Sequence, residues 1–386
     1  MTRIAFYTGV NKLNYSDITL LVNGKNAFPE IIKSIENAQK SIVINMFIWR
    51  DDEIGNKVAA AVLDAADRGV KVNISVDRYG VVLEKCEEAE KSFFHKRLSI
   101  IEKIKIAALK FLYPENCSQR CICDERTELY NKIVSHPNIT VSADELKADH
   151  SKYYIMDDKV LFLGGINIED KENGCDISGR VYGDYMAKLC GERYVDAFKK
   201  KLVRGENVLD DLFYGINVKK EERLFEMEKL YLDMIAEAKT DLHITMAYFS
   251  PLKSFIDAII AAYKRGVRVT LVLPQKANFQ NDSNRRTVRK LLRATNGGIE
   301  VYFSPKMLHT KLVVNDCMIS FGSTNITKKA FGQLDELNLF LENTESDFKS
   351  TLYKSIADDI GESQRISDYK KVRYNRILAF LEGFLV

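Results

Sequence analysis

Two stretches of the chain, 35–49 and 235–249, share one pattern of apolar and polar positions. Each begins with the end of a predicted helix, where alanine stands at Ala38 or Ala238, and runs into an apolar segment of strand character. A repeated unit of this kind predicts a chain that is built from two similar halves.

An amphipathic helix is predicted after each apolar segment, at roughly 54–67 and 252–264. Both helices end in Arg-Gly-Val, where Gly69 and Gly266 have the position of helix C-caps, and a β-branched strand follows. Because neighbouring parallel strands need a crossover connection, this alternation of helix and strand predicts a parallel sheet covered by helices in each half.

Each half also contains a predicted hairpin: Tyr153–Met156 with Val160–Leu163, and Leu312–Val314 with Met318–Phe321. Asp157-Asp158 and Asn315-Asp316 supply the turns. The hairpins therefore belong to the repeat and occupy matching places in the two halves.

The length of 386 residues suits two domains, which we place at 1–205 and 206–386. The first half carries an extra segment near 84–130, and the second half ends in a helical tail. Apolar residues make up 46% of the chain and charged residues 29%, which excludes disordered, collagen-like and disulfide-framework classes. The net charge is only +3, so binding of nucleic acid or of an anionic membrane must depend on local basic clusters.

Seven cysteines form an odd set and the first residues show no signal-peptide pattern, so a reducing, cytoplasmic location is expected. Cys117, Cys121 and Cys123 lie close together, but their spacing is not a two-pair zinc pattern. No run reaches the ~18–20 apolar residues that a membrane-spanning helix requires. Membrane contact is therefore expected to be peripheral.

A motif that occurs once in each half carries the main chemical signal. The first copy reads His150, Lys152 and Asp157, followed by Gly164, Gly165 and Asn167. The second copy reads His309, Lys311 and Asp316, followed by Gly322, Ser323 and Asn325. A lone histidine is usually a packed or surface residue, but two of only five histidines stand at matching positions of the repeat. This duplication indicates one site that is built from both halves.

The paired motif contains the groups that phosphodiester chemistry needs: a nucleophile, an acid for the leaving oxygen and fixed positive charge. One histidine can attack phosphorus and form a phosphohistidine, while the other, protonated, delivers a proton to the departing alcohol. Lys152 and Lys311 are expected to hold the non-bridging oxygens, with Asn167 and Asn325 as neutral donors. A catalytic metal is then unnecessary, and no cofactor is expected.

A histidine nucleophile usually needs a carboxylate or a carbonyl on its other ring nitrogen. Asp184 and Glu336 follow the two motifs on short strand-like segments, where alternation would point them inward; the alternative for each is a surface carboxylate. Asp157 and Asp316 stand at predicted turns, so for them a turn-stabilising role is at least as good an interpretation as a chemical one.

These residues resemble the signature of the phospholipase D superfamily, a duplicated His-x-Lys-x4-Asp with a trailing Gly-Gly or Gly-Ser and Asn. The stretches 20–55 and 64–80 look like bacterial cardiolipin synthases, and the resemblance covers most of the chain. It implies an α/β fold of two similar phospholipase D-like α/β/α domains, related by a pseudo-twofold axis around one shared active site. It also implies a phosphatidyltransferase that joins two phosphatidylglycerols into cardiolipin and releases glycerol; some relatives use other donors or acceptors.

The resemblance implies that His150 is the nucleophile and that His309 is the general acid and base. The other residues that we assign to the catalytic set are Lys152, Asp157, Asn167, Asp184, Lys311, Asp316, Asn325 and Glu336, and we expect Gly164, Gly165 and Ser323 to contact the substrate. Family members usually carry a Trp-x-Asp segment where this chain has Val181-Tyr182-Gly183-Asp184, so the role of Asp184 is the weaker assignment, whereas 336–338 matches better. Many cardiolipin synthases begin with two membrane-spanning helices, and this chain resembles the shorter relatives.

Two segments are candidates for peripheral attachment to anionic phospholipid on the inner face of the cell membrane. The stretch 91–113 mixes Ile, Leu and Phe with lysines and an arginine, and 373–386 is similar. The alternative is that each segment packs its apolar face on the protein and turns a basic face to solvent. Because the insertion lies just upstream of His150, we expect it near the entrance for lipid.

Two other enzymes would use the same histidines. A phospholipase D-type hydrolase takes water as the acceptor, and a nuclease of the superfamily needs an electropositive groove, for which the basic segment 281–293 is a candidate. The Gly164-Gly165 pair, the amino-terminal half and the apolar basic insertion favour an anionic phospholipid over nucleic acid. A non-catalytic binding protein is disfavoured because both motifs keep their histidine, lysine and asparagine.

Overall fold

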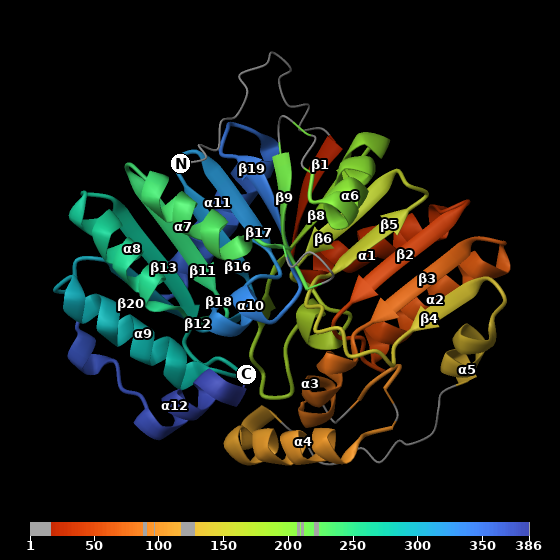
Figure 1. The fold of residues 1–386 in the computed structure, drawn as a ribbon, viewed down its shortest axis with the longest axis horizontal. Helices are drawn as coiled ribbons and strands as arrows, with labels where there is room; N and C mark the ends of the chain where they lie inside the picture. The colour runs from red at the N-terminus through yellow and green to blue at the C-terminus, as the bar shows by residue number, and fades with distance from the viewer. Residues whose placement is uncertain are drawn as a thin grey trace.

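The computed structural model describes residues 17–87, 91–95, 97–116, 128–206, 209, 212–219 and 224–385. Figure 1 shows the amino-terminal half, red to yellow, on one side of the molecule and the carboxy-terminal half, green to blue, on the other. A large sheet stands in each half.

The first sheet has the strand order β1-β8-β6-β5-β2-β3-β4. Its strands are β1 (Ile18–Val22), β2 (Ser41–Met46), β3 (Lys71–Val76), β4 (Ile139–Ser142), β5 (Tyr153–Met156), β6 (Val160–Gly164) and β8 (Tyr185–Cys190). Strands β2, β3 and β4 are parallel, whereas the pairs from β2 through β5, β6 and β8 to β1 are antiparallel.

The second sheet has the order β10-β9-β19-β17-β16-β11-β13-β14-β20. Its strands are β9 (Leu212–Val218), β10 (Leu224–Phe225), β11 (Asp241–Met246), β13 (Arg268–Pro274), β14 (Glu300–Ser304), β16 (Lys311–Asn315), β17 (Met318–Gly322), β19 (Glu336–Glu342) and β20 (Gln364–Ile366). Its seven central strands, from β9 to β14, repeat the order of the first sheet, so the expected pair of similar α/β domains is confirmed.

The expectation of parallel sheets holds only for β2-β3-β4 and for β11-β13-β14. Both predicted hairpins join these same sheets, and a hairpin is necessarily antiparallel, so each sheet is mixed. Two short ladders complete the strands: β7 (Tyr182–Gly183) pairs with β15 (Met307–Leu308), and β12 (Phe249–Ser250) pairs with β18 (Ile326–Thr327). The ladder of β7 and β15 joins the two halves beside His309.

Helices pack on the outer face of each sheet. They are α1 (Asn23–Asn37), α2 (Glu53–Asp67) and α5 (Glu128–Ser135) in the first half, and α7 (Met227–Glu237), α8 (Lys253–Lys264) and α9 (Asn281–Ala294) in the second. Local sequence sets their ends: Asp52 caps α2 by accepting a hydrogen bond from the Gly55 amide at 2.9 Å, and Gly69 follows with a φ of 97°.

The inner faces of the two sheets share one apolar core. It contains the buried side chains of Leu161 and Leu163 on β6, Phe321 on β17 and Leu339 on β19. Helices α6 (Glu192–Arg204) and α11 (Asp347–Gly361) flank this core. The two halves are therefore held face to face, and the boundary that we place at 205/206 falls in the connection between α6 and β9.

The extra segment of the first half contributes α3 (Val81–Cys86) and α4 (Ile100–Leu112). The three cysteines considered for zinc, Cys117, Cys121 and Cys123, lie outside the described residues. The remaining helices are α10 (Lys328–Gly332) and α12 (Arg376–Leu385). None of the helices that the structure describes combines the length and apolar character needed to span a membrane.

Candidate active site

The two motif histidines lie at the junction of the halves, each just before the first strand of its hairpin. The His150 amide donates a hydrogen bond to the Asp335 carbonyl at 2.8 Å, across the junction. His309 follows β15, whose pairing with β7 crosses the same junction. Both histidines are buried. The structure thus brings the two predicted histidines into one site.

Lys152 and Lys311 are fully buried beside them. Each ammonium group donates to the carbonyl oxygen of its own histidine, from Lys152 to His150 and from Lys311 to His309. Burial, followed by the charge of Lys311, lowers the pKa of Lys152 to about 7. An anionic phosphate group that enters the site would stabilise the charged form of this buried lysine.

His150 is paired with one carboxyl group, which comes from the opposite half. Its Nδ1 lies 3.1 Å from Oε2 of Glu336, and the Ser323 hydroxyl donates to that same oxygen. Burial raises the pKa of Glu336 to about 8. Burial, followed by the charges of Lys152, Lys311 and His309, lowers the pKa of His150 well below its ordinary value. His150 is therefore neutral near pH 7 and has a lone pair for attack.

His309 is paired with two carboxyl groups, both from the first half. Its Nδ1 lies 3.1 Å from Oδ2 of Asp184 and 3.0 Å from Oε1 of Glu172. Burial and Lys311 oppose protonation of His309, but Glu172 and Asp184 outweigh them and raise the pKa of its imidazole. His309 is therefore the more readily protonated of the two motif histidines.

Glu172 was not expected from the sequence. It lies in a 3-10 turn, Asp170–Asn173, five residues after Asn167, and its side chain is buried. The sequence signal that points to it is weak: three acidic residues, Glu169, Asp170 and Glu172, begin two positions after the motif asparagine. Only the fold shows that this turn reaches the other half.

Asp184 is held in place by its neighbours. Its carboxylate lies 3.4 Å from the Lys311 ammonium and accepts the Tyr185 amide at 2.8 Å, while its own amide donates to Oδ1 of Asn23 at 3.1 Å. Gly165 leaves room for it, because a Cβ at this position would lie 2.2 Å from Oδ2 of Asp184. The inward orientation expected for Asp184 is what the structure shows.

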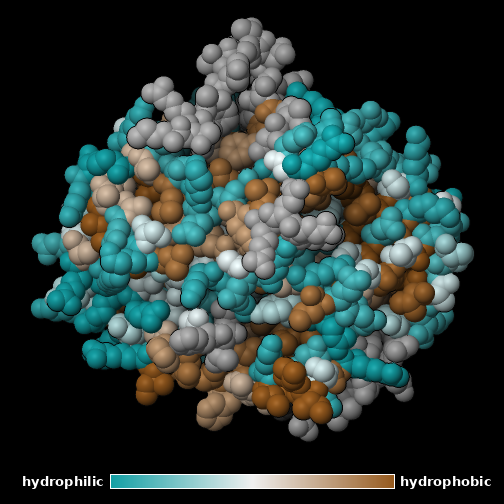
Figure 2. Space-filling model, in the orientation of Figure 1, coloured by the Kyte–Doolittle hydropathy of each residue, from teal (hydrophilic) through white to brown (hydrophobic). Residues whose placement is uncertain are grey.

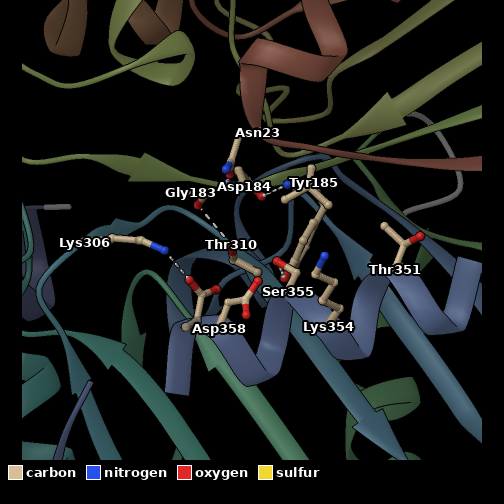
Figure 3. A pocket seen from close by; sticks show the side chains of 12 residues that line it. Asn23, Gly183, Asp184, Tyr185, Lys306, Thr310, Thr351, Lys354, Ser355 and Asp358 are labelled. Carbon is tan, nitrogen blue, oxygen red and sulfur yellow. Dashed lines mark hydrogen bonds and ion pairs between the residues drawn. The ribbon is translucent and has the colours of Figure 1, made fainter. Parts of the chain in front are cut away.

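A polar cavity lies behind each histidine partner. One of about 210 Å³ borders Asp184 and Thr310, and Figure 3 shows Lys306, Ser355 and Lys354 around it. Another, of about 530 Å³, borders Glu336 on the opposite side. Neither cavity is lined by a motif histidine, and each borders a carboxyl group that faces one.

A third cavity, of about 70 Å³, opens directly on His150. Apolar and aromatic side chains make up much of its walls: Phe47, Tyr79, Leu83, Tyr248, Ala330 and Leu334. Besides His150, its polar members are Gln280, Asn325, Thr327 and Lys329. Phe47 also packs edge-on against the His150 ring at 4.7 Å between centroids. Of these three cavities it is the one that a motif histidine lines, and we call it the His150 mouth.

The two motif asparagines are buried near the histidines. Asn167 donates from Nδ2 to Glu169 at 3.4 Å, and its Oδ1 has no hydrogen-bond partner among the described residues. Oδ1 of Asn325 accepts the Tyr248 amide at 3.3 Å, which leaves its amino group to donate. Both asparagines are thus buried beside the site, and their role as donors to the substrate stays a prediction.

Asp157 and Asp316 lie away from this cluster, in the positions that the turn-stabilising interpretation predicts. Asp157 follows Lys152 by five extended residues, roughly 16 Å at ~3.3 Å per residue. Its carboxylate accepts the amides of residues 39, 40 and 41, and Asp316 accepts those of 239, 240 and 241. Both aspartates fasten a hairpin turn to the start of the neighbouring strand.

For Gly164, Gly165 and Ser323, which we expected to contact substrate, the structure shows close contacts within the protein. A Cβ at Gly164 would lie 2.2 Å from the Tyr185 carbonyl oxygen, so this glycine permits the close approach of β8. Ser323 accepts the Leu337 amide at 2.9 Å and donates to Glu336. Gly165 and Ser323 therefore lie against the carboxyl groups of Asp184 and Glu336, and substrate contact by the three residues stays a prediction.

Glu172, Asp184 and His309 have potential metal-ligand atoms within 4.8 Å of one another, the one such group among the described residues. The same carboxylates already face two cationic groups, the His309 imidazolium and the Lys311 ammonium. Nδ1 of His309 and Oε1 of Glu172 lie 3.0 Å apart as an ion pair, although neither atom forms a hydrogen bond among the described residues.

Comparison with known proteins agrees with this geometry. The family described as "Cardiolipin synthase, PLD-like domain" matches residues 31–176 and 231–358, one match in each half. Cardiolipin synthase B of Escherichia coli O6:H1 is 25% identical over 361 residues, which cover 87% of this chain and 78% of that protein. The cardiolipin synthase of Clostridium perfringens is 27% identical over 357 residues, covering 85% of this chain and 67% of that protein.

The fold itself is shared with a solved structure. Phosphatidylserine synthase of Haemophilus influenzae superposes with a TM-score of 0.68 over 97% of this chain and 92% of that chain, at 14% sequence identity. Since the family match covers both halves and most of the residues between β2 and α11, the chain belongs to the phospholipase D superfamily and, within it, to the family of cardiolipin synthase-like phosphatidyltransferases.

Proposed function

We propose that this protein makes cardiolipin from phosphatidylglycerol, or from a related phospholipid donor, through a phosphohistidine intermediate on His150. The unequal pairing of the two histidines carries the mechanism: Glu336 alone faces His150, whereas Asp184 and Glu172 both face His309. The substrate follows from the relatives that bear the name cardiolipin synthase. The apolar walls of the mouth suit a lipid.

In the first half-reaction, Nε2 of neutral His150 attacks the phosphorus of the donor. The bond between phosphorus and the headgroup oxygen breaks, and His309 gives its proton to that oxygen, so glycerol leaves from phosphatidylglycerol. The phosphatidyl group is then bound to His150. Lys152 and Lys311, with amide donors from Asn167 and Asn325, would stabilise the charge on the non-bridging oxygens.

In the second half-reaction, the hydroxyl of a second phosphatidylglycerol attacks the phosphorus. His309, now neutral, takes the hydroxyl proton, and the bond between phosphorus and His150 breaks. Both histidines return to their starting protonation states. The scheme uses no metal, because histidines and lysines supply the acid, the base and the positive charge.

Product analysis tests the proposal. Purified protein is incubated with phosphatidylglycerol vesicles, and lipids and glycerol are measured by mass spectrometry, with His150→Ala and His309→Ala as controls. Cardiolipin and glycerol in equal amounts from the wild type alone are the expected result. Phosphatidic acid without cardiolipin would indicate a hydrolase rather than a transferase. The absence of lipid turnover would favour a nuclease.

The second test looks for the intermediate. Wild-type protein is quenched in alkali after brief exposure to labelled phosphatidylglycerol, and the site of any acid-labile phosphoryl linkage is mapped. We expect the label on His150 and none on His309, because only His150 is neutral before substrate binds. Label on His309 would reverse the two roles.

We further propose that the protein works as a peripheral protein on the inner face of the cell membrane. Donor and acceptor are both bilayer lipids in this scheme, so the mouth beside His150 must reach a membrane surface. The surface that would make this contact can be inferred from the structure.

A further inference from the structure

Exposed apolar side chains are concentrated on two helices. Twelve large hydrophobic side chains are exposed among the described residues, and six of them belong to α4 and α12. On α4 these are Ile100, Ile101, Ile104 and Phe111, with exposed fractions from 63% to 85%. On α12 they are Ile377 at 72% and Phe380 at 60%.

Helix α4 has two apolar faces. Ile106 and Leu109 are buried against the protein. At about 100° per residue, Ile100, Ile104 and Phe111 fall within roughly 40° of one another and point away from that buried face. A surface helix normally turns polar residues outward, so this second apolar stripe calls for a partner other than water.

Lysines flank the exposed stripe of α4. Lys103 lies on one side of it and Lys105 on the other, and both side chains are exposed. The acidic residue of this helix, Glu102, is engaged by Arg78 at 2.9 Å on the protein side. Helix α12 begins in a basic stretch with exposed Arg373 and Arg376. An apolar stripe between exposed cations matches the chemistry of an anionic lipid interface.

The two helices lie on the same rim of the molecule although they are more than 260 residues apart in sequence. The Tyr113 hydroxyl, directly after α4, donates to Oε1 of Glu382 on α12 at 2.9 Å. Glu382 also accepts the Ser283 amide at 2.6 Å, which ties α12 to α9. Figure 2 shows hydrophobic residues gathered along the lower edge, where Figure 1 places α4 and α12.

This rim is continuous with the mouth of the site. The buried face of α4 belongs to a small apolar cluster that also contains Leu83 and Tyr248. Both of these residues line the cavity that opens on His150. A lipid whose acyl chains rest beside α4 thus meets an apolar path toward the histidines.

We propose that the exposed faces of α4 and α12 form one docking surface that inserts into the interfacial layer of an anionic phospholipid bilayer and presents the His150 mouth to it. The inference rests on the proposed function for its lipid substrate, but binding can be measured without turnover. A bilayer fits better than a protein partner, because the apolar side chains stand on separate convex helices flanked by cations rather than in a groove.

The main test is flotation with phosphatidylglycerol vesicles and with phosphatidylcholine vesicles. Wild type is expected to bind the anionic vesicles at least about tenfold more tightly. The variant Ile104→Ser/Phe111→Ser should lose tenfold or more of this affinity. The matched control is Val134→Ser/Val203→Ser, which removes two exposed apolar side chains from α5 and α6 and should bind as wild type does.

The same variants are assayed for turnover of a short-chain phosphatidylglycerol below its critical micelle concentration. We expect Ile104→Ser/Phe111→Ser to turn over this soluble substrate at the wild-type rate while its activity on vesicles falls about as much as its binding. Thermal unfolding near the wild-type temperature shows that the fold is intact. If the wild type does not turn over the soluble substrate, the proposed function is overturned, but the vesicle-binding result still tests the docking surface.

Three results would overturn the docking surface. One is unchanged vesicle binding by Ile104→Ser/Phe111→Ser, and another is equal binding of wild type to neutral and anionic vesicles. The third is self-association of wild type through this rim, detected by sedimentation and abolished by the same two substitutions, with no binding to vesicles.

A further variant, Lys103→Gln/Lys105→Gln, should weaken binding to anionic vesicles only, and more strongly at low salt.

Discussion

The two motif histidines occupy equivalent places in the repeat but meet different numbers of carboxyl groups. Counted from the motif asparagine, the residue equivalent to Glu172 is Ala330, so among the described residues only His309 has a second carboxylate. Because Glu172 and Asp184 raise the pKa of His309, this additional carboxylate helps to separate the proposed acid from the proposed nucleophile. The asymmetry predicts distinct pH limits for the two histidines.

Glu172→Gln should shift one limb of the pH profile. Activity needs neutral His150 and protonated His309, so it should fall at low pH through the pKa of His150 and at high pH through that of His309. Removal of the Glu172 charge lowers the pKa of His309, and the high-pH limb of kcat should move down by about one unit or more. The measurement is kcat against pH on a soluble short-chain substrate.

Glu336→Gln is the matched control for this shift. Because its pKa is raised to about 8, Glu336 is largely protonated near neutral pH, and glutamine resembles that state. Its high-pH limb should stay where the wild type has it. Equal profiles for Glu172→Gln and wild type would show that Glu172 does not hold the proton on His309.

Gly165→Ala should inactivate the protein without unfolding it. The added Cβ would press on Oδ2 of Asp184 at 2.2 Å, so the carboxylate that orients His309 must move. We expect kcat to fall by roughly 10²-fold, as misplacement by about 1 Å commonly costs. Gly332→Ala, where no atom lies within 4 Å of the added Cβ, should keep wild-type kcat. Wild-type activity in Gly165→Ala would mean that Asp184 needs no fixed position.

At the scale of elements, the sequence predicts the features that are encoded locally. It misses those that depend on contacts between segments far apart in sequence. The repeated helices, the parallel strands β2 and β11 that precede them and both hairpins follow from periodicity and turn residues. The mixed character of the sheets and the approach of Glu172 to His309 do not, because each is set by packing between segments that are far apart in sequence. Likewise, the sequence marks 91–113 and 373–386 as amphipathic, but only the fold places α4 beside α12.

The turn aspartates show how one motif residue serves an element rather than the chemistry. Asp157 occupies the first position of its hairpin turn with a φ of 54° and accepts three amides at the start of β2. Burial opposes its ionisation, but these amides outweigh it and lower the pKa of Asp157. Its contribution to stability should therefore be present above the unfolded pKa of about 3.9 and be lost as the pH falls.

Asp157→Asn should lower the free energy of unfolding by about 1–2 kcal/mol at pH 7 and leave kcat at 25 °C unchanged. Asparagine tolerates the positive φ, so the loss reports the hydrogen bonds rather than backbone strain. Urea titration measures the difference, which should shrink below about pH 4. Asp158→Asn, which removes only a surface pair with Lys199, should cost less than about 0.5 kcal/mol. A large drop in kcat for Asp157→Asn would show that Asp157 has a role in catalysis.

At the scale of the whole molecule, the carboxyl partners of each histidine come from the other half. His150 of the first half depends on Glu336 of the second, and His309 of the second depends on Asp184 and Glu172 of the first. The apolar core between the sheets, which includes Leu163 and Leu339, holds these partners together. Site assembly and docking of the halves are therefore one event.

Because the two halves share this core, the protein should unfold as one cooperative unit. Calorimetry is expected to show a single transition, and loss of activity should coincide with it. Leu163→Ala removes a fully buried side chain from the shared core and should destabilise the whole molecule by about 2–5 kcal/mol, moving that transition to lower temperature without dividing it. Ile259→Ala, in the outer core of the second half, is the matched comparison. Two resolved transitions in the wild type would mean that the halves at 1–205 and 206–386 are stable apart, and that the carboxylates crossing between them are aligned by docking of folded domains.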